Sequence, residues 1–366
     1  MREGIHSVRE APVAGKRVLL RVDFNVPLDT ARGAPRVAND LRIRSALPTL
    51  ELLHKNGAAK IIILTDIGRP GGKVVEGLRV APIAEHLHTL TSVPFEMEEN
   101  LRFDPGEESN SAEYAQKLAA LGDLYVNEAF ANSHRSHASM VALSALLPSY
   151  AGLRFEEEIE RLSAALTPPP GAIALIGGAK FETKEPLITK LLSLYAQVLL
   201  GGALANDVIK ARGLPFGSSL ISTIPVPTEV AANERLVVPT DAIFSEEGSN
   251  AERLGLVFDI RANESIIDIG PETSKKWSTV ITQAPFVLWN GPMGVYERGY
   301  RDGTEALASA LSASGTRAVV GGGDTAAAVE KYTFDAEKVF ISTGGGAMLE
   351  FLVRGTLPAI DALRQH

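Results

Sequence analysis

The sequence predicts an α/β protein made of two parallel-sheet domains. Short apolar runs recur along the chain, and a helical pattern follows each of them. Continuous apolar runs of this kind are typical of strands that are buried on both faces of a parallel sheet. The length of 366 residues favours two domains. Near the middle of the chain a helical stretch ends in three prolines, which suggests a connector between the two domains.

The expected strands lie in two groups on either side of that connector. In the first half they are residues 18–24, 61–65 and 124–127, with a weaker run at 94–97. In the second half they are residues 172–176, 198–200, 236–238, 266–269, 286–289, 318–320 and 339–342. Alternation of strand and helix implies crossover connections, and such folds bind ligands at the carboxyl ends of their strands.

The connector begins with Phe155–Leu166, which has the pattern of an amphipathic helix with an acidic first turn. Thr167–Pro170 stops that helix, because proline cannot continue it. We interpret the stretch as a semi-rigid link, although a surface helix within one domain has the same pattern. The predicted segments are an N-terminal domain (1–152), a connecting helix with a proline linker (153–170), a C-terminal domain (171–345) and a C-terminal segment (346–366).

Composition narrows the function classes. The chain has no cysteine, which excludes disulfides and thiolate chemistry and fits a cytoplasmic location. No stretch approaches the length of an apolar membrane span. The net charge of −8 argues against general nucleic-acid binding. We therefore expect neither a membrane nor a nucleic acid as a partner.

One stretch, Ala318–Tyr332, reads as a strand, a glycine turn and a helix. Gly321, Gly322 and Gly323 permit a sharp turn, and Asp324 or Thr325 is expected to cap the helix that follows. A helix N-terminus suits phosphate, and the Asp324 carboxylate suits Mg²⁺. Glycine turns also serve dinucleotides or tight packing, so this stretch alone leaves those alternatives open.

The first half contains polar residues in comparable places. Alternation along the strand at 18–24 puts Arg21, Asp23 and Asn25 on one side, where they need partners or a ligand. Internal pairing of Arg21 with Asp23 is the alternative. Arginine is suited to forked recognition of phosphate. Four arginines near strand ends or glycine turns therefore indicate an anion site: Arg42, Arg69, Arg102 and Arg135.

The second half adds lysines and further glycine pairs. Gly177 and Gly178 follow the strand at 172–176, and Lys180 and Lys184 are four residues apart, which predicts one helical face. Either an anionic partner or a solvated lysine face accounts for that spacing. A second pair, Gly201 and Gly202, follows the next strand.

The loop after the strand at 286–289 contains two candidate ligand contacts, Asn290 and Glu297. A second triple-glycine turn lies within Phe340–Glu350, so the second half holds two turns suited to phosphate.

Nine short motifs follow one another along nearly the whole chain. They are RVDFNVP (21–27), GRP (68–70), ENLRF (99–103), HRSHAS (134–139), GGAK (177–180), DIGPET (268–273), WNGPMGV (289–295), GGGDT (321–325) and STGGGA (342–347). No single motif is decisive, but together and in this order they resemble the phosphoglycerate kinase family.

The resemblance implies two doubly wound, Rossmann-like domains joined by a helix and facing across a hinged cleft, with the C-terminal segment returning to the N-terminal domain. It implies reversible phosphoryl transfer between 1,3-bisphosphoglycerate and ADP, giving 3-phosphoglycerate and ATP, in a monomeric cytoplasmic enzyme that uses Mg²⁺. The implied triose ligands are Asp23, Asn25, Arg42, Asp66, Arg69, Arg102 and Arg135. The implied nucleotide ligands are Lys184, Gly201, Asn290, Glu297, Gly322, Gly323, Asp324 and Thr325.

The family also implies particular roles. Asp324 would hold Mg²⁺, and Glu297 would contact the ribose. Lys184 and Thr325 would hold nucleotide phosphates. Arg42 and Lys180 would be the catalytic residues, because positive charge around the moving group is what phosphoryl transfer requires. Closure of the cleft would bring the two substrates into line and exclude water.

Three positions depart from the family pattern. Asp66 replaces a histidine before GRP, Thr183 replaces an aspartate before the second lysine, and Glu128 replaces an aspartate in the family's NDAF motif. Asp66 is expected to weaken triose binding unless it pairs with Arg69, so Asp66→His is expected to lower the KM for 3-phosphoglycerate. The departures leave open a catalytically weak or inactive relative that only binds these ligands. A nicotinamide-dependent dehydrogenase fits poorly, because neither glycine turn has the GxGxxG pattern.

Overall fold

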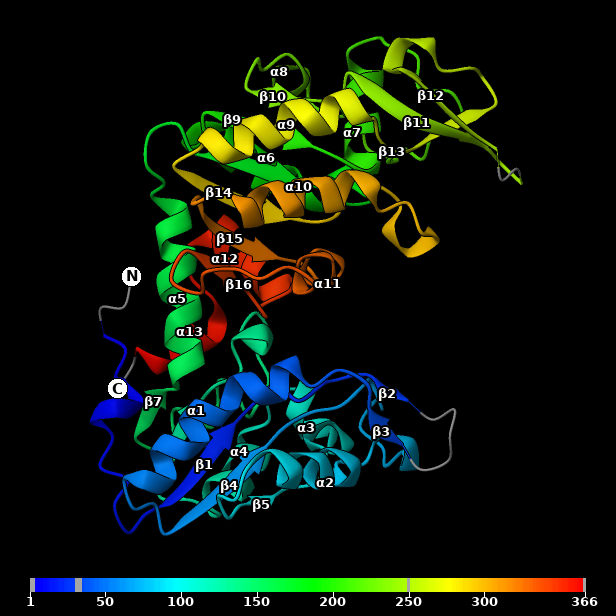
Figure 1. Cartoon of the computed structure of the whole chain (residues 1–366). Coiled ribbons are helices and arrows are strands. Elements are labelled where there is room, and N and C mark those ends of the chain that lie inside the picture. Colours follow the sequence, from blue (N-terminus) through cyan, green and yellow to red (C-terminus); the bar gives the residue numbers. More distant parts are fainter. Residues whose placement is uncertain (1–3, 30–34, 249–250, 365–366) are drawn as a thin grey trace. The chain divides into compact units, whose positions relative to one another are not determined.

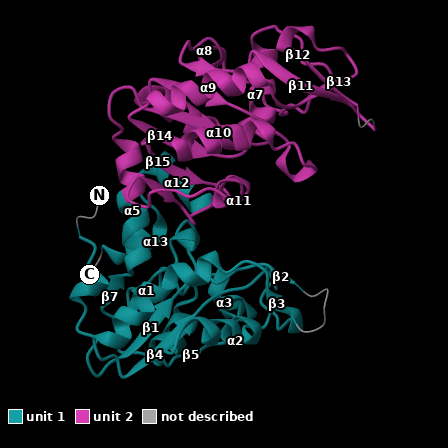
Figure 2. Cartoon of the chain, viewed as in Figure 1, with its two compact units in different colours: residues 1–160, 346–366 teal, residues 161–345 magenta. Residues whose placement is uncertain are grey.

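The computed structural model describes residues 4–29, 35–248 and 251–364 (Figure 1). The chain forms two compact units (Figure 2). Unit 1 consists of Met1–Glu160 together with Gly346–His366, and unit 2 consists of Arg161–Gly345. The division falls inside helix α5 (Leu153–Leu166). The predicted segment boundaries and their functional assignments stay predictions, and residues 1–3 and 365–366 at the outer ends lie outside the described residues.

Unit 1 is built around a five-stranded sheet with the order β5-β4-β1-β6-β7, in which every neighbouring pair is parallel. From β1 the chain builds one side of the sheet and then the other, so the strand order reverses at β1. That reversal is where open α/β sheets bind ligands. The strands are β1 (Arg17–Arg21), β4 (Lys60–Leu64), β5 (Glu96–Met97), β6 (Leu124–Asn127) and β7 (Ser149–Ala151).

Strand β1 is shorter than the sequence predicts. It ends at Arg21 rather than residue 24, and beyond it the N–H of Phe24 donates to the side chain of Thr65 at 3.1 Å. Strand alternation therefore does not extend to Asp23 or Asn25. Arg21 pairs with Asp66 and Asp23 with Arg42, so the alternative of a direct Arg21–Asp23 pair is not what forms, although the Arg21 charge still acts on the Asp23 carboxyl. A separate antiparallel pair follows, formed by β2 (Leu28–Asp29) and β3 (Arg36–Val37).

The unit 1 helices cover the sheet and connect its strands. A single apolar cluster joins α1 and α2 to strands β1, β4 and β6. The helices are α1 (Leu41–Lys55), α2 (Ala81–Leu90), α3 (Pro105–Glu108), α4 (Ala112–Ala119), α12 (Gly346–Arg354) and α13 (Pro358–Leu363). Short 3-10 turns are η1 (Val8–Glu10), η2 (Glu76–Leu78), η3 (Leu101–Phe103) and η4 (Phe130–Asn132).

The C-terminal helices pack on the end of unit 1 beyond β6. Phe351 of α12 meets Phe130 edge to face at a centroid distance of 6.1 Å. Ala359 of α13 is buried in a small cluster with Ala129 and Met140. Its N–H donates to the carbonyl of Ser133 at 3.2 Å. The last helices are therefore part of the unit 1 core.

Glu128 holds the start of α5. Its buried carboxylate accepts the N–H groups of Arg154 at 3.1 Å and Phe155 at 3.2 Å, and the Thr49 hydroxyl donates to it at 2.5 Å. A carboxylate at a helix N-terminus accepts hydrogen bonds from N–H groups that would otherwise be unpaired, and its negative charge interacts favourably with the positive end of the helix dipole. Burial raises the pKa of Glu128 to about 7. This departure from the family pattern therefore serves the connecting helix.

Unit 2 is built around a six-stranded sheet with the order β10-β9-β8-β14-β15-β16, again entirely parallel. The strand order reverses between β8 and β14. The strands are β8 (Ile173–Ile176), β9 (Gln197–Leu200), β10 (Leu236–Val237), β14 (Phe286–Asn290), β15 (Arg317–Gly321) and β16 (Val339–Ile341).

The predicted strand at 266–269 exists but does not join the parallel sheet. It belongs to β13 (Glu264–Ile269), which pairs antiparallel with β11 (Asp241–Glu246), and β12 (Glu252–Leu256) lies on the other edge of β11. The sequence did not predict β11 or β12. A short apolar run has no direction of its own, and β12 alternates between exposed and half-buried residues.

Helices cover both faces of the large sheet. Trp277, Ile281 and Leu307 pack with Val287 and Trp289 on one face. The intervening strand residues are buried as well, so the other face is also covered. The helices are α6 (Phe181–Leu194), α7 (Ala203–Ala211), α8 (Thr228–Ala231), α9 (Pro271–Gln283), α10 (Asp302–Ala313) and α11 (Gly323–Glu330), with 3-10 turns η5 (Val257–Asp259) and η6 (Tyr296–Arg298). The predicted α/β class with two parallel-sheet domains is confirmed.

Candidate active site

The polar residues predicted in unit 1 gather at the carboxyl ends of β1 and β4. Arg42, near the start of α1, places Nη1 3.0 Å from an oxygen of Asp23 and donates to the carbonyl of Asn25 at 3.0 Å. The side-chain oxygen of Asn25 accepts the N–H of Gly68 at 3.1 Å. Arg102, in η3, donates to the carbonyl of Gly68. The segments that follow β1 and β4 are thus tied to η3 and to the start of α1 in one site.

The remaining arginines complete a cluster of positive charge. Burial and the like charges of Arg102 and Arg69 lower the pKa of Arg135. Arg69 itself is exposed, whereas Arg135 and Arg42 are half-buried. The charges of Arg102 and Arg69 thus act on Arg135, and a bound anion relieves repulsion between like charges. The six predicted residues other than Asp66 therefore form a site that is suited to a phosphorylated or carboxylated ligand.

Asp66 occupies a different position from the one expected. Its carboxylate is 1% exposed and pairs with the fully buried Arg21 and, at 3.2 Å, with Arg102. Asn132 also donates to it at 2.5 Å. These partners do not include Arg69, whose pairing with Asp66 was the condition for undisturbed triose binding. Because the carboxylate is buried among its partners, it holds Arg21 and Arg102 in position and balances their charge rather than facing an incoming ligand.

The charges around Asp66 also fix its protonation. Burial alone would raise its pKa, but the guanidinium charges of Arg21 and Arg102 outweigh burial and hold the pKa below its usual value. Burial together with Arg102 lowers the pKa of His137 to about 4, and burial with Arg135 lowers that of His134. The charge of the site at neutral pH therefore comes from its arginines and not from its histidines.

In unit 2 the candidate residues lie at the carboxyl ends of β8, β14 and β15, beside the strand reversal. Lys184, in the first turn of α6, donates to the carbonyl of Gly177 at 2.6 Å and to the side-chain oxygen of Asn290 at 3.0 Å. Gly322 follows β15 with a φ of 96°, a conformation that favours glycine. The backbone turns sharply there and exposes the start of α11.

Two local predictions in unit 2 are wrong. Helix α6 begins at Phe181, so Lys180 is its extended N-cap residue and does not share a helical face with Lys184. Helix α11 begins at Gly323 with Gly322 as its N-cap, so neither Asp324 nor Thr325 caps it. The cap of α11 thus lies two or three residues before the predicted one.

Thr325 and Asp324 point in different directions. Thr325 is fully buried, and its hydroxyl oxygen accepts the N–H of Gly291 at 2.9 Å. Asp324 is exposed and lines a pocket. Thr325 therefore ties the β15 turn to the β14 turn, while the Asp324 carboxylate remains accessible to a ligand.

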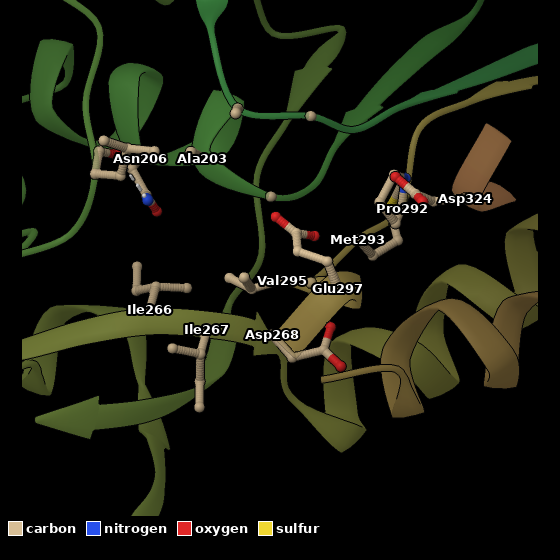
Figure 3. A pocket seen from close by; sticks show the side chains of 15 residues that line it. Ala203, Asn206, Ile266, Ile267, Asp268, Pro292, Met293, Val295, Glu297 and Asp324 are labelled. Atoms are coloured by element: carbon tan, nitrogen blue, oxygen red, sulfur yellow. Dashed lines mark hydrogen bonds between the residues drawn. The ribbon is translucent and has the colours of Figure 1, made fainter. Parts of the chain in front are cut away.

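The pocket has a volume of about 200 Å³. Glycine backbone from Gly178 and Gly202 forms part of its wall, together with apolar side chains. Figure 3 shows Asp324 and Asn206 at opposite ends, with Glu297 between them. Of the predicted glycine pair, Gly202 rather than Gly201 lines this pocket, since Gly201 packs against Met293.

Sequence reasoning missed one polar residue of this pocket and gave no role to another. Asn206 lies inside α7, and a lone asparagine in a helical stretch carries no signal. Asp268 belongs to the DIGPET motif but was given no function of its own. Burial raises the pKa of Asp268 to about 6, and its carboxylate accepts the N–H of Gly303 at 3.0 Å.

The position of Lys184 predicts that the affinity for ADP depends on pH. Burial lowers its pKa to about 8, so the free protein loses this positive charge as the pH rises through that value. A bound phosphate favours the charged form, and we therefore expect the Kd for ADP to rise by about tenfold per pH unit above pH 8. Calorimetric titration of ADP across this range measures the slope.

Lys184→Arg provides the control, because its guanidinium stays charged throughout the range. Its ADP affinity should change little with pH. A wild-type Kd that is flat between about pH 7 and about pH 9.5 would contradict a phosphate contact by Lys184.

Among the described residues, no helix is long and apolar enough to cross a membrane. In the same residues, no three histidine, aspartate or glutamate side chains gather as a metal cage. Two doubly wound sheets, one with an arginine-lined site and one with glycine turns and a pocket, define an α/β protein that handles phosphorylated small molecules.

Known proteins identify the family. A family model described as phosphoglycerate kinase matches residues 8–354. The phosphoglycerate kinase of Herpetosiphon aurantiacus is 39% identical over 98% of both chains, and that of Thermomicrobium roseum is 40% identical over 99% of this chain and 100% of its own. The chain belongs to the phosphoglycerate kinase family.

Solved structures agree with this assignment. The phosphoglycerate kinase of Coxiella burnetii matches with a TM-score of 0.85 and 36% identity, over 99% of this chain and 98% of its own. That of Pyrococcus horikoshii matches with a TM-score of 0.83 and 28% identity, over 98% of both chains. The chain is accordingly a phosphotransferase with a carboxyl group as acceptor, and its reaction is the reversible transfer of a phosphoryl group between 1,3-bisphosphoglycerate and ADP in glycolysis.

Proposed function

We propose that unit 1 binds 3-phosphoglycerate and 1,3-bisphosphoglycerate. The observation that carries this assignment is the cluster of Arg69, Arg102 and Arg135, whose mutual repulsion calls for an anion. Asp23 and Asn25 lie beside it and offer acceptors for the hydroxyl of the triose. Asp66, a predicted substrate ligand, serves in this proposal as the buried partner of Arg21 and Arg102.

Unit 2 binds ADP and ATP in the pocket beside β14. Asp324 lies at one end and Glu297 in the middle, which matches the order of phosphates and ribose in a nucleotide (Figure 3). Lys184 and the start of α11 supply positive charge for the phosphates. The proposed ligands are Lys184, Gly201, Asn290, Glu297, Gly322, Gly323, Asp324 and Thr325, to which the pocket lining adds Gly202.

Mg²⁺ accompanies the nucleotide in this proposal, with Asp324 as its protein ligand. The exposed Asp324 carboxylate at the pocket end fits a magnesium ion, which usually takes one or two carboxylates together with substrate phosphates. When bound, the ion neutralises phosphate charge. No cage of protein carboxylates is needed for this arrangement.

Arg42 and Lys180 are the proposed catalytic residues. The phosphoryl group leaves the acyl oxygen of 1,3-bisphosphoglycerate and joins an oxygen of the β-phosphate of ADP, so no protein nucleophile is required. The charges of Arg42 and Lys180 stabilise the group during transfer. Closure of the two units would align the substrates and exclude water. We further propose a monomer in the cytoplasm, with neither a nucleic acid nor a membrane as partner.

The test is formation of ATP by the purified protein from ADP, Mg²⁺ and 1,3-bisphosphoglycerate. Turnover should be strongly reduced in Lys180→Ala and unchanged in Lys276→Ala, which removes an exposed lysine of α9. Tight ADP binding without turnover in the wild type would instead favour a binding protein that has lost activity.

A further inference from the structure

Asn206 is a buried polar residue at the end of the pocket that lies away from Asp324. It belongs to the middle of α7 and is 2% exposed. In Figure 3 its amide is directed toward the pocket, on the side of Ile266. A polar group in this position needs a partner, because an unpaired buried acceptor is costly.

The hydrogen bonding of Asn206 fixes which of its atoms is left over. Its nitrogen Nδ2 donates to the carbonyl of Leu220 at 3.1 Å. The reverse orientation would set two acceptor oxygens against each other, so the amide cannot turn round. Its oxygen Oδ1 has no hydrogen-bond partner among the residues that the structure describes. The site therefore presents one oriented acceptor.

The segment that carries Leu220, the hydrogen-bond partner of Asn206, is held in place by further contacts. The next residue, Asp207, accepts the N–H of Ser222 at 2.7 Å and its hydroxyl at 2.8 Å. The N–H of Phe181 donates to the same hydroxyl at 2.8 Å. Leu220 thus sits on a segment that is fastened to both α7 and α6, and the Asn206 acceptor is preorganised before any ligand arrives.

The position of Asn206 corresponds to the base of a nucleotide. With phosphates at Asp324 and ribose at Glu297, the base would reach the apolar end near Ile266 and Val295 (Figure 3). This placement rests on the proposed nucleotide site in unit 2. Apolar walls with one oriented polar group are typical of sites that select among similar ligands.

We propose that Asn206 is a specificity-determining residue, whose Oδ1 accepts a hydrogen bond from the 6-amino group of adenine. A 6-oxo purine such as hypoxanthine places an acceptor at the same position. Two acceptors repel, and the buried oxygen then stays unpaired. The enzyme therefore favours 6-amino over 6-oxo purine nucleotides, and the preference resides in one amide oxygen.

Three diphosphates that differ at position 6 of the base test the proposal: ADP, purine riboside diphosphate and IDP, in which N1 also carries a hydrogen. In the wild type we expect ADP to bind roughly tenfold more tightly than IDP, with the unsubstituted purine between them. Asn206→Leu, which is similar in size but has no acceptor, should bring the three affinities together. Ser222→Ala loosens the Leu220 segment without removing the oxygen, so it should retain the order.

Equal wild-type affinities for the three diphosphates would overturn the proposal without recourse to any variant. An unchanged ADP to IDP ratio in folded Asn206→Leu would overturn it as well. A different result would show that the proposed nucleotide site in unit 2 is wrong. If Glu297→Ala and Lys184→Ala leave the ADP affinity unchanged, the base does not bind at this end of unit 2 at all.

Discussion

Arg42→Ala is expected to lower kcat by about 10³-fold, with a smaller effect on the KM for ADP. Arg42 holds its guanidinium between Asp23 and the carbonyl of Asn25, at the edge of the arginine cluster. Its charge stabilises the transferring group in the proposed mechanism, and the group's charge is most spread at the transition state. Steady-state and single-turnover assays of both variant and wild type measure the loss.

Arg44→Ala is the matched control for this experiment. Arg44 lies two residues further along the same helix, is exposed and pairs with Asp40 at 2.9 Å. Its removal changes the net charge equally and should leave kcat unchanged. Arg42→Lys should recover part of the rate, since it keeps the charge but not the forked geometry. If kcat of Arg42→Ala stays close to that of the wild type, the catalytic role of Arg42 is refuted.

Asp66→Asn is expected to destabilise unit 1 by about 3–5 kcal/mol, because it removes the carboxylate that two buried guanidinium groups share, leaving Arg102 with Glu108 and Arg21 with the charge of Glu107. The partners concerned are Arg21 and Arg102, both almost completely buried. The same reasoning reverses the expectation for Asp66→His. A histidine supplies no negative charge, so it should disturb the arginines and raise the KM for 3-phosphoglycerate. Denaturant unfolding and steady-state kinetics measure the two effects.

The stabilising contribution of the Asp66 carboxylate should decrease in acid. Because the pKa of Asp66 is held below its ordinary value of 3.8, its contribution is fully present above that value and is lost as the pH falls through the lower folded pKa. The difference between wild type and Asp66→Asn should therefore shrink in acid. Asp123→Asn, which breaks the exposed pair with Arg17, should have a much smaller effect at every pH. Equal effects of the two substitutions would contradict the buried-network account.

The sequence predicted the features that depend on local pattern. Apolar runs located the parallel strands, and glycines located the turns of unit 2. Four arginines were expected together, and their contacts and electrostatics place them in one cluster in unit 1. Each of these features depends on residue type and on spacing along the chain, so it can be predicted without the structure.

Features that depend on distant partners could not be predicted in this way. Asp66 looked like a carboxylate facing an anion, but Arg21 and Asn132 enclose it, and neither is near it in sequence. Likewise, the run at 266–269 has the composition of a parallel strand, and only its partner β11 makes it antiparallel. Asn206 became informative only when the carbonyl of Leu220 had fixed its orientation.

The path of the chain through the two units has a consequence for biosynthesis. Unit 2 is one uninterrupted segment, whereas unit 1 needs helices α12 and α13, which follow unit 2 along the chain. Phe351 and Ala359 fill its core beside Phe130 and Met140. On the ribosome, domains usually fold in the order in which they emerge. Here unit 1 stays incomplete until α12 and α13 have been synthesised after unit 2, so unit 2 can finish folding before unit 1.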